Sequence, residues 1–155
     1  MIIQAAQYSD LETLNQLMFD LHEEHHLQAP DQFKTAQEIE QEKSIARYLD
    51  DPECLVFVAR EGDHIIGFIT GHFCELVSTV SKAVLMGSVD ELYVEPRFRQ
   101  KGVAQALFHK IESRFIGYGV KQIFVEVWAF NQTAQQFYQQ QGFGHHIHWL
   151  RKPVD

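Results

Sequence analysis

The sequence has few of the features that mark secreted, membrane-bound or nucleic-acid-binding proteins. It contains only two cysteines, Cys54 and Cys74, both inside apolar runs, so we expect no disulfide framework and a reducing compartment. No apolar run approaches the roughly 18 residues of a membrane span, and the start MIIQAAQYSD lacks the basic residues of a signal peptide. These absences predict a cytoplasmic protein with no membrane partner.

Basic residues are also scarce. Lysine and arginine number 13 against 21 aspartate and glutamate residues, which gives a net charge of −8. Nucleic-acid binding needs clustered basic side chains, so we expect no nucleic-acid partner, and a cationic partner suits the acidic surface better. The 155 residues are 45% hydrophobic and 22% charged, typical of a globular protein, and predict one domain spanning 1–155.

Hydrophobic periodicity and turn residues predict the secondary structure. The expected elements are a strand over 1–6, a helix opened by Ser9 in a capping box with Glu12, a helix over 35–49, strands over 54–60, 64–74 and 84–94, a helix over 102–116, a strand over 121–127, a helix over 132–140 and a last strand over 143–150. This order predicts an α/β (α+β) fold with a single mixed, mostly antiparallel sheet flanked by helices. The crossover through 102–116 should make 84–94 and 121–127 parallel neighbours.

One glycine-containing loop has the properties of a phosphate-binding site. Arg99-Gln-Lys-Gly102-Val-Ala104 lies between a predicted strand and a predicted helix. Backbone N–H groups at a helix N-terminus are unpaired and the helix dipole favours an anion there. Gly102 and Ala104 leave room for close approach, and Arg99 and Lys101 add positive charge.

The pattern [QR]-x-x-G-x-[GA] occurs three times, so context has to decide between the matches. Arg114-x-x-Gly117-x-Gly119 and Gln139-x-x-Gly142-x-Gly144 each follow a predicted helix and precede a predicted strand. Their glycines therefore fit helix C-caps. Only the match beginning at Arg99 aims N–H groups at a ligand.

A second motif follows at a specific distance. The runs V-D-E-L-Y-V-E-P-R-F-R-Q-K-G-V-A-x-x-L and N-x-x-A-x-x-F-Y-x-x-x-G-F together resemble the GNAT N-acetyltransferase superfamily, and the resemblance covers 84–143. It implies the acyl-CoA N-acyltransferase fold, acetyl-CoA as co-substrate, no metal, and direct transfer of acetyl to a primary amine in a ternary complex. The one departure is Ala104, where glycine is commoner in the family.

The resemblance also implies roles for individual residues. The pyrophosphate of acetyl-CoA would bind backbone N–H groups of the glycine loop, and pantetheine would pair with the preceding strand at Leu92 and Val94. Asn131 would contact the cofactor, although the residue also fits a plain helix N-cap. The implied cofactor-binding residues are Leu92, Tyr93, Val94, Arg99, Gln100, Lys101, Gly102, Val103, Ala104, Gln105, Asn131 and Ala134.

Three residues are candidates for proton transfer. Tyr138 matches the tyrosine that sits beside the sulfur in the family, although a tyrosine beside apolar residues also fits the core. A primary amine must lose a proton before attack, to a carboxylate or to a water chain, and the candidate carboxylates are Asp90 and Glu91. Strand alternation places these two on opposite faces and slightly favours Glu91, which shares a face with Tyr93. We expect the oxyanion to be held by a strand N–H, at Leu92.

A rival reading comes from His22-Glu23-Glu24-His25-His26, which matches the H-E-x-x-H spacing of zinc hydrolases. No third ligand is evident, and the run ends its helix shortly before a proline, so a solvated helix end is favoured.

In an acetyltransferase the first two helices usually border the acceptor site, which makes Glu23, Glu24 and His26 candidate substrate contacts. Expected acceptors are small cationic amines of the polyamine or aminoglycoside type. A non-catalytic acyl-CoA sensor of the same fold is a further alternative, and homodimers are common in the family.

Overall fold

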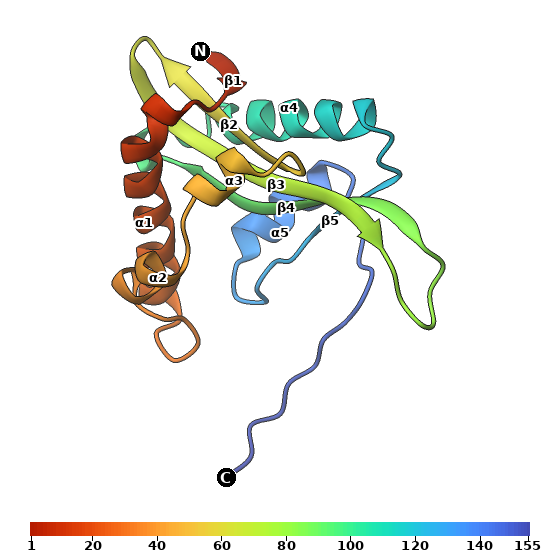
Figure 1. The fold of residues 1–155 in the computed structure, drawn as a ribbon. Helices are drawn as coiled ribbons and strands as arrows, with labels where there is room; N and C mark the ends of the chain where they lie inside the picture. Colours follow the sequence, from red (N-terminus) through yellow and green to blue (C-terminus); the bar gives the residue numbers. More distant parts are fainter. The chain divides into compact units, whose positions relative to one another are not determined.

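The computed structural model describes all residues from 1 to 155, and these divide into two compact units, Met1–Val125 and Glu126–Asp155. The elements of the larger unit are β1 (Ile2–Ala5), the 3-10 turn η1 (Tyr8–Asp10), α1 (Leu11–Gln28), α2 (Ala36–Glu42), α3 (Ala46–Asp50), β2 (Cys54–Glu61), β3 (His64–Leu76), β4 (Val84–Val94), the 3-10 turn η2 (Pro96–Phe98), α4 (Val103–Gly117) and β5 (Gln122–Val125) (Figure 1). The smaller unit contains α5 (Gln132–Gln140).

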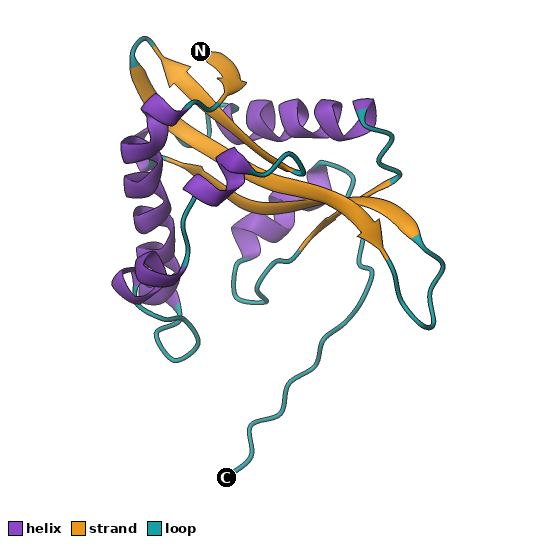
Figure 2. Ribbon diagram, viewed as in Figure 1, coloured by secondary structure: helices purple, strands orange, loops and turns teal.

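The strands form one sheet in the order β1-β2-β3-β4-β5. The first four strands pair antiparallel, and β4 pairs parallel with β5, which confirms both the mixed, mostly antiparallel sheet and the predicted parallel neighbours. Figure 2 shows helices on either side of these strands within the larger unit. Neither cysteine is in a disulfide, and no helix combines the length and hydropathy needed to cross a bilayer.

The two faces of this sheet carry different helices. On one face α4 lies close to the backbone, because a Cβ added to Gly87 would come within 2.7 Å of the Phe115 ring and one added to Gly71 within 2.7 Å of Ile111. On the other face Phe68 and Tyr93 belong to a buried cluster with one side of α1, formed by Leu14, Leu17, Met18 and Leu21. The glycines on β3 and β4 therefore make room for α4, whereas Phe68 and Tyr93 pack against α1.

Two helix predictions need correction. The helix predicted over 35–49 is two helices, because Lys43 is extended (φ −121°, ψ 126°) and the buried Ile45 follows it before α3 begins. Tertiary contacts of these two residues override a continuous helical pattern. The capping box predicted for Ser9 and Glu12 is also wrong: α1 begins at Leu11, directly after η1, and the capping box belongs to η1, where the Asp10 side chain accepts from Gln7 N (2.9 Å).

The predicted last strand, 143–150, is wrong. No residue of that segment is in a strand, and the sheet ends at β5. The residue pattern of the segment indicates only which side chains could share one face of a strand. A strand also needs a neighbour for its N–H and C=O groups, which the pattern does not encode.

Candidate functional site

The loop between η2 and α4 has the backbone geometry of an anion site. Gln100 and Gly102 both have left-handed backbone conformations (φ 61° and 83°), and Gly102 is the N-cap of α4. Ala106 N donates to Gly102 O (3.0 Å), so the N–H groups of Val103, Ala104 and Gln105 precede the first bond along the helix. A Cβ on Gly102 would meet nothing within 4 Å. The loop therefore presents open space in front of free helix N–H groups, which suits a phosphate.

The two basic residues of this loop have different surroundings. Arg99 donates from Nε to Val94 O (2.7 Å) and from Nη2 to both carboxylate oxygens of Glu24 (2.8 and 3.0 Å), with its guanidinium over the Tyr93 ring. Lys101 is exposed, and its Nζ lies 5.7 Å from the centroid of the Phe98 ring. Arg99 thus joins the loop to β4 and α1, whereas Lys101 keeps its charge at the surface.

The edge of β4 that precedes this loop lacks a strand partner over its last residues. Glu95 N donates to Ile66 O on β3 (2.9 Å). N–H groups alternate between the two sides of a strand, so those of Leu92 and Val94 point away from β3. On that side β5 pairs only with Met86–Val89. The backbone groups predicted to bind pantetheine therefore face an open strand edge, although Val94 O already accepts from the arginine described above. Tyr93 pairs with β3 instead, and its ring is in the core.

The competing matches to the loop pattern are helix ends. Gly119 (φ 86°) follows α4, where Val120 N bonds back to Phe115 O and Gly119 N to Ile116 O. Gly142 (φ 100°) has the same pair of bonds after α5, with Phe143 N donating to Tyr138 O. Both are Schellman motifs, so their C-cap interpretation is confirmed.

Asp90 and Glu91 lie on the same face of the sheet, and the prediction that they face opposite sides is wrong. The pairing of β3 with β4 shifts at this point: Thr70 faces Glu91, but the next residue of β3 faces Val89, so Asp90 is an extra residue in a β-bulge. Thr70 contacts Glu91 and His72 contacts Asp90, and these two β3 residues, two positions apart, share one face. A bulge reverses the alternation that follows it.

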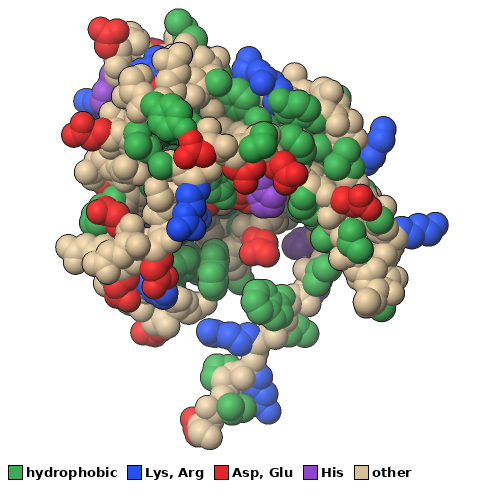
Figure 3. Space-filling view, in the orientation of Figure 1, with side chains coloured by type: hydrophobic (Ala, Val, Ile, Leu, Met, Phe, Trp, Pro, Cys, Tyr) green, Lys and Arg blue, Asp and Glu red, His purple; other side chains and the backbone are tan.

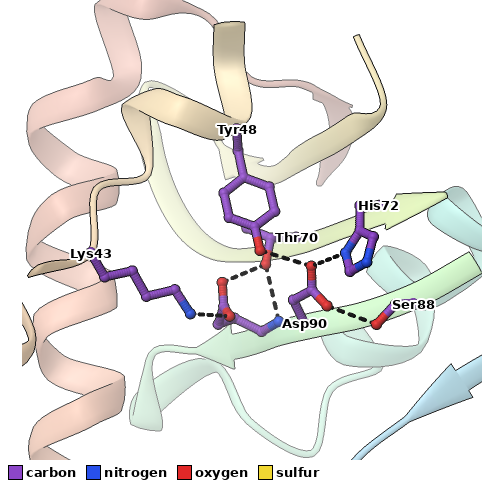
Figure 4. A network of polar contacts seen from close by, with 7 residues as sticks. Lys43, Tyr48, Thr70, His72, Ser88 and Asp90 are labelled. Carbon is purple, nitrogen blue, oxygen red and sulfur yellow. Dashed lines mark hydrogen bonds and ion pairs between the residues drawn. The ribbon is translucent and has the colours of Figure 1, made fainter. Parts of the chain in front are cut away.

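Each of the two carboxylates contacts more than one polar side chain (Figure 4). Glu91 accepts from Thr70 Oγ1 (2.7 Å) and from Lys43 Nζ (2.7 Å), one donor on each oxygen. Asp90 accepts from Tyr48 OH (2.8 Å), His72 Nδ1 (2.7 Å) and Ser88 Oγ (2.8 Å). Burial, followed by the neighbouring carboxylates, raises the pKa of Tyr48 and keeps its phenol protonated.

In the smaller unit, Asn131 and Tyr138 occupy defined positions on α5. Asn131 is the N-cap, since its side chain accepts from Ala134 N (3.1 Å). Tyr138 is buried, packs edge-on against Phe137 and Phe143, and has a pKa raised by burial. A phenol that stays protonated suits a proton donor, the role for which the position beside the sulfur made Tyr138 a candidate.

The comparisons with known proteins fit this geometry. The model of the acetyltransferase (GNAT) family matches residues 16–143. The chain belongs to the GNAT acetyltransferase family. An acetyltransferase from Vibrio fischeri is 57% identical, with a TM-score of 0.70 and coverage of 83% of this chain and 97% of that one.

Two further relatives are more distant. An uncharacterized N-acetyltransferase of Mycobacterium bovis is 31% identical over 98 residues, 63% of this chain and 58% of that protein, so the chain spans less than two thirds of this curated relative. An aminoglycoside antibiotic 6'-N-acetyltransferase from Acinetobacter haemolyticus shares the fold at 17% identity, with a TM-score of 0.75 and 100% coverage of both chains. The predicted fold class and family are thus confirmed.

The H-E-x-x-H run lies on the last part of α1 as expected, but it is half-buried and is not the solvated helix end that was predicted. His26 Nδ1 contacts Phe33 O (2.9 Å), Glu24 pairs with Arg99, and His22 Nε2 is buried without a hydrogen-bond partner. No group of three His, Cys, Asp or Glu residues is arranged to hold a metal ion. Of the three predicted substrate contacts, Glu24 and His26 already have partners within the protein.

No sequence pattern predicted Lys43, Tyr48, Thr70 or His72 as part of the site. These residues come from the α2–α3 connection, α3 and β3, and no local motif marks any of them. Lys43 is separated from Glu91 by 48 positions, and Tyr48 from Asp90 by 42. Only the register of β3 with β4 and the break before α3 bring them to the two carboxylates.

Proposed function

We propose that this protein is an N-acetyltransferase that moves acetyl from acetyl-CoA to a small cationic primary amine by direct transfer. The observation that carries the proposal is the loop at Gly102, where open space and free helix N–H groups adjoin a strand edge without a partner. Membership of the GNAT family supports the same activity.

The residues present fit acetyl-CoA. The backbone N–H groups of Val103, Ala104 and Gln105 would bind its phosphates, and the edge at Leu92 and Val94 would bind the pantetheine arm. Acetyl-CoA supplies an acetyl group activated as a thioester. The N–H of Leu92 would donate to the acetyl oxygen, the interaction that stabilises charge as it develops there.

Charge and cavity chemistry support a cationic acceptor. The net charge is −8, and Figure 3 shows acidic side chains spread over the visible face of the molecule. A polar cavity of about 300 Å³ lies between α1 and the α2–α3 segment, lined by Glu12, Asn15, Gln16, Glu40, Lys43 and Ser44. It adjoins the lysine that pairs with Glu91. The aminoglycoside acetyltransferase that shares this fold supports a small-molecule amine as the acceptor class.

A thiol-release assay with acetyl-CoA and a panel of amines tests the proposal. We expect turnover with polyamines or aminoglycosides and an acceptor KM that rises with salt, because exposed charges are screened beyond roughly 10 Å at 0.1 M. Preference for neutral or acidic acceptors would exclude the cationic class. Acetyl-CoA binding without release of the CoA thiol in the presence of any amine would favour the sensor alternative.

A further inference from the structure

We propose that His72 is the general base of the acetyl transfer, with Nε2 as the proton acceptor and Asp90 as its positioning residue. The inference rests on the proposed function and assigns the base to a residue outside both family motifs. His72 lies on β3, its side chain is 38% exposed, and its Nδ1 lies 2.7 Å from Asp90 Oδ2 (Figure 4).

The contact with Asp90 determines which imidazole nitrogen can accept a proton. An ionised carboxylate only accepts hydrogen bonds, so Nδ1 carries the hydrogen and donates it to Asp90. The lone pair of the neutral ring is then on Nε2, and none of the hydrogen bonds of this network involves Nε2. A base oriented by a carboxylate through its other nitrogen is a recurrent arrangement in enzymes.

The two carboxylates are less suitable as the direct base. Glu91 has Thr70 on one oxygen and the Lys43 ammonium on the other, and its side chain is only 7% exposed. Asp90 accepts from three side chains and is 15% exposed. A proton taken up by either carboxylate would compete with these donors, whereas none of the hydrogen bonds of this network occupies Nε2 of His72.

The position of Asp90 connects the pair to the reacting region. Asp90 is the bulged residue, and Val89 is the last residue of β4 to pair with β5. The open edge thus begins at Asp90, and Leu92 is two residues further on, about 7 Å along an extended strand. The imidazole therefore belongs to the part of the sheet where the amine and the acetyl group would meet.

The groups around the imidazole come from each neighbouring element. Asp90 and Ser88 lie on β4, and Tyr48 lies on α3. Cys54 on β2 is the residue that pairs with His72 in the sheet. Burial, with a contribution from Asp51, raises the pKa of the Cys54 thiol to about 11. The thiol and the Tyr48 phenol are both protonated near neutral pH, so Asp90 is the charged group in contact with the ring.

The proton step balances without any further reactant. An N–H bond of the acceptor ammonium breaks and an Nε2–H bond forms, which leaves a neutral amine with its lone pair and an imidazolium beside the Asp90 carboxylate. The amine nitrogen then attacks the acetyl carbon as the C–S bond breaks, and the second proton that it loses as the amide forms reaches the departing thiolate. The imidazolium afterwards releases its proton to water.

Kinetics of two single variants and their combination test the assignment. We expect His72→Gln and Asp90→Asn each to lower kcat by roughly 10²-fold with little change in the KM for acetyl-CoA, the lower end of the range for loss of a general base. The double variant should be no worse than His72→Gln, because Asp90 acts through the imidazole. Added imidazole should restore part of the activity of His72→Gly. His64→Gln, a change in an exposed β3 histidine, should leave kcat unchanged.

A second readout does not depend on turnover. Nitrogen NMR of the ring without acetyl-CoA should show the Nδ1–H tautomer in the wild-type protein and a loss of that preference in Asp90→Asn. An Nε2–H ring in the wild-type protein, or full kcat in His72→Gln, overturns the assignment and leaves the proposed function standing. If the wild-type protein transfers acetyl to no amine, the proposed function fails and the assignment fails with it.

Discussion

Lys43 Nζ lies 2.7 Å from Glu91 Oε2 and joins the break between α2 and α3 to the middle of β4. Glu91 is nearly inaccessible, so removal of its cationic partner leaves a buried carboxylate with one neutral donor. We expect Lys43→Gln to lower the free energy of unfolding by about 1–2 kcal/mol, less than for a fully buried pair because Lys43 is partly solvated. Urea unfolding measures this change.

Lys34 provides the matched control. Its Nζ also contacts a glutamate, Glu42 (2.9 Å), but both side chains are well exposed. Exposed pairs contribute little to stability, so Lys34→Gln should leave the urea midpoint almost unchanged. Equal effects of the two substitutions would mean that the contact with Glu91 does not stabilise the fold.

The parts of the fold that depend on local sequence could be predicted. The mixed, mostly antiparallel sheet and the crossover to β5 follow from periodicity and from connection rules that depend on local sequence. The loop at Gly102 has a local signature as well, because the glycine, the preceding strand and the following helix are contiguous. These features were predicted and the structure contains them.

The polar contacts of Asp90 and Glu91 join residues that are distant in sequence. Alternation predicted opposite faces for Asp90 and Glu91, and only the register shift against Thr70 brings them to one face. Similarly, the helical pattern across Lys43 gave no sign of the break that directs its side chain to β4. The environment of a catalytic residue is set by strand register and helix breaks, which single residues alter without a local signal.

Gly102→Glu tests the loop. The substitution adds a negative charge where phosphates would approach the N–H groups of α4. We expect the affinity for acetyl-CoA, measured by calorimetry, to fall by roughly tenfold or more, equivalent to about 1.4 kcal/mol for each factor of ten. The added side chain would point into open space, so the fold should survive apart from the strain of a left-handed backbone.

Two control variants separate charge from strain. Gly102→Gln has the same backbone strain and almost the same shape without the charge, and should bind more tightly than the glutamate variant. Gly117→Glu places the same charge at the end of α4, where a side chain also meets nothing within 4 Å, and should bind normally. Unchanged affinity in a folded Gly102→Glu protein would remove the loop from the cofactor site.

His22 makes stability depend on pH. Burial, then the charges of Lys43 and His25, lower the pKa of His22 from 6.5 to about 4. In the unfolded chain this histidine takes up a proton as the pH falls below about 6.5, whereas in the folded protein it stays neutral until about pH 4. The unfolded state binds more protons in this window, so stability is full above it and falls as the pH decreases through it.

Unfolding curves between pH 7.5 and pH 4.5 test this linkage. The wild-type protein should lose more stability over this range than His22→Gln, which cannot titrate there but keeps a polar side chain in α1. The difference between the two proteins isolates His22 from the carboxylates and the other histidines. Parallel curves for both proteins would show that His22 titrates normally in the folded state.

Tyr138→Phe tests the proton donor for the departing thiolate. The ring packs against Phe137 and Phe143, and the substitution keeps this packing, so folding and acetyl-CoA affinity should barely change. Burial raises the pKa of Tyr138, so the wild-type phenol holds its proton throughout the neutral range and is available as an acid. Its loss should lower kcat by roughly 10²-fold, or less if water replaces it, with little change in KM.

Tyr8→Phe, at an exposed tyrosine, should leave kcat unchanged. Full kcat in Tyr138→Phe at every pH would reduce Tyr138 to a packing residue and require another donor.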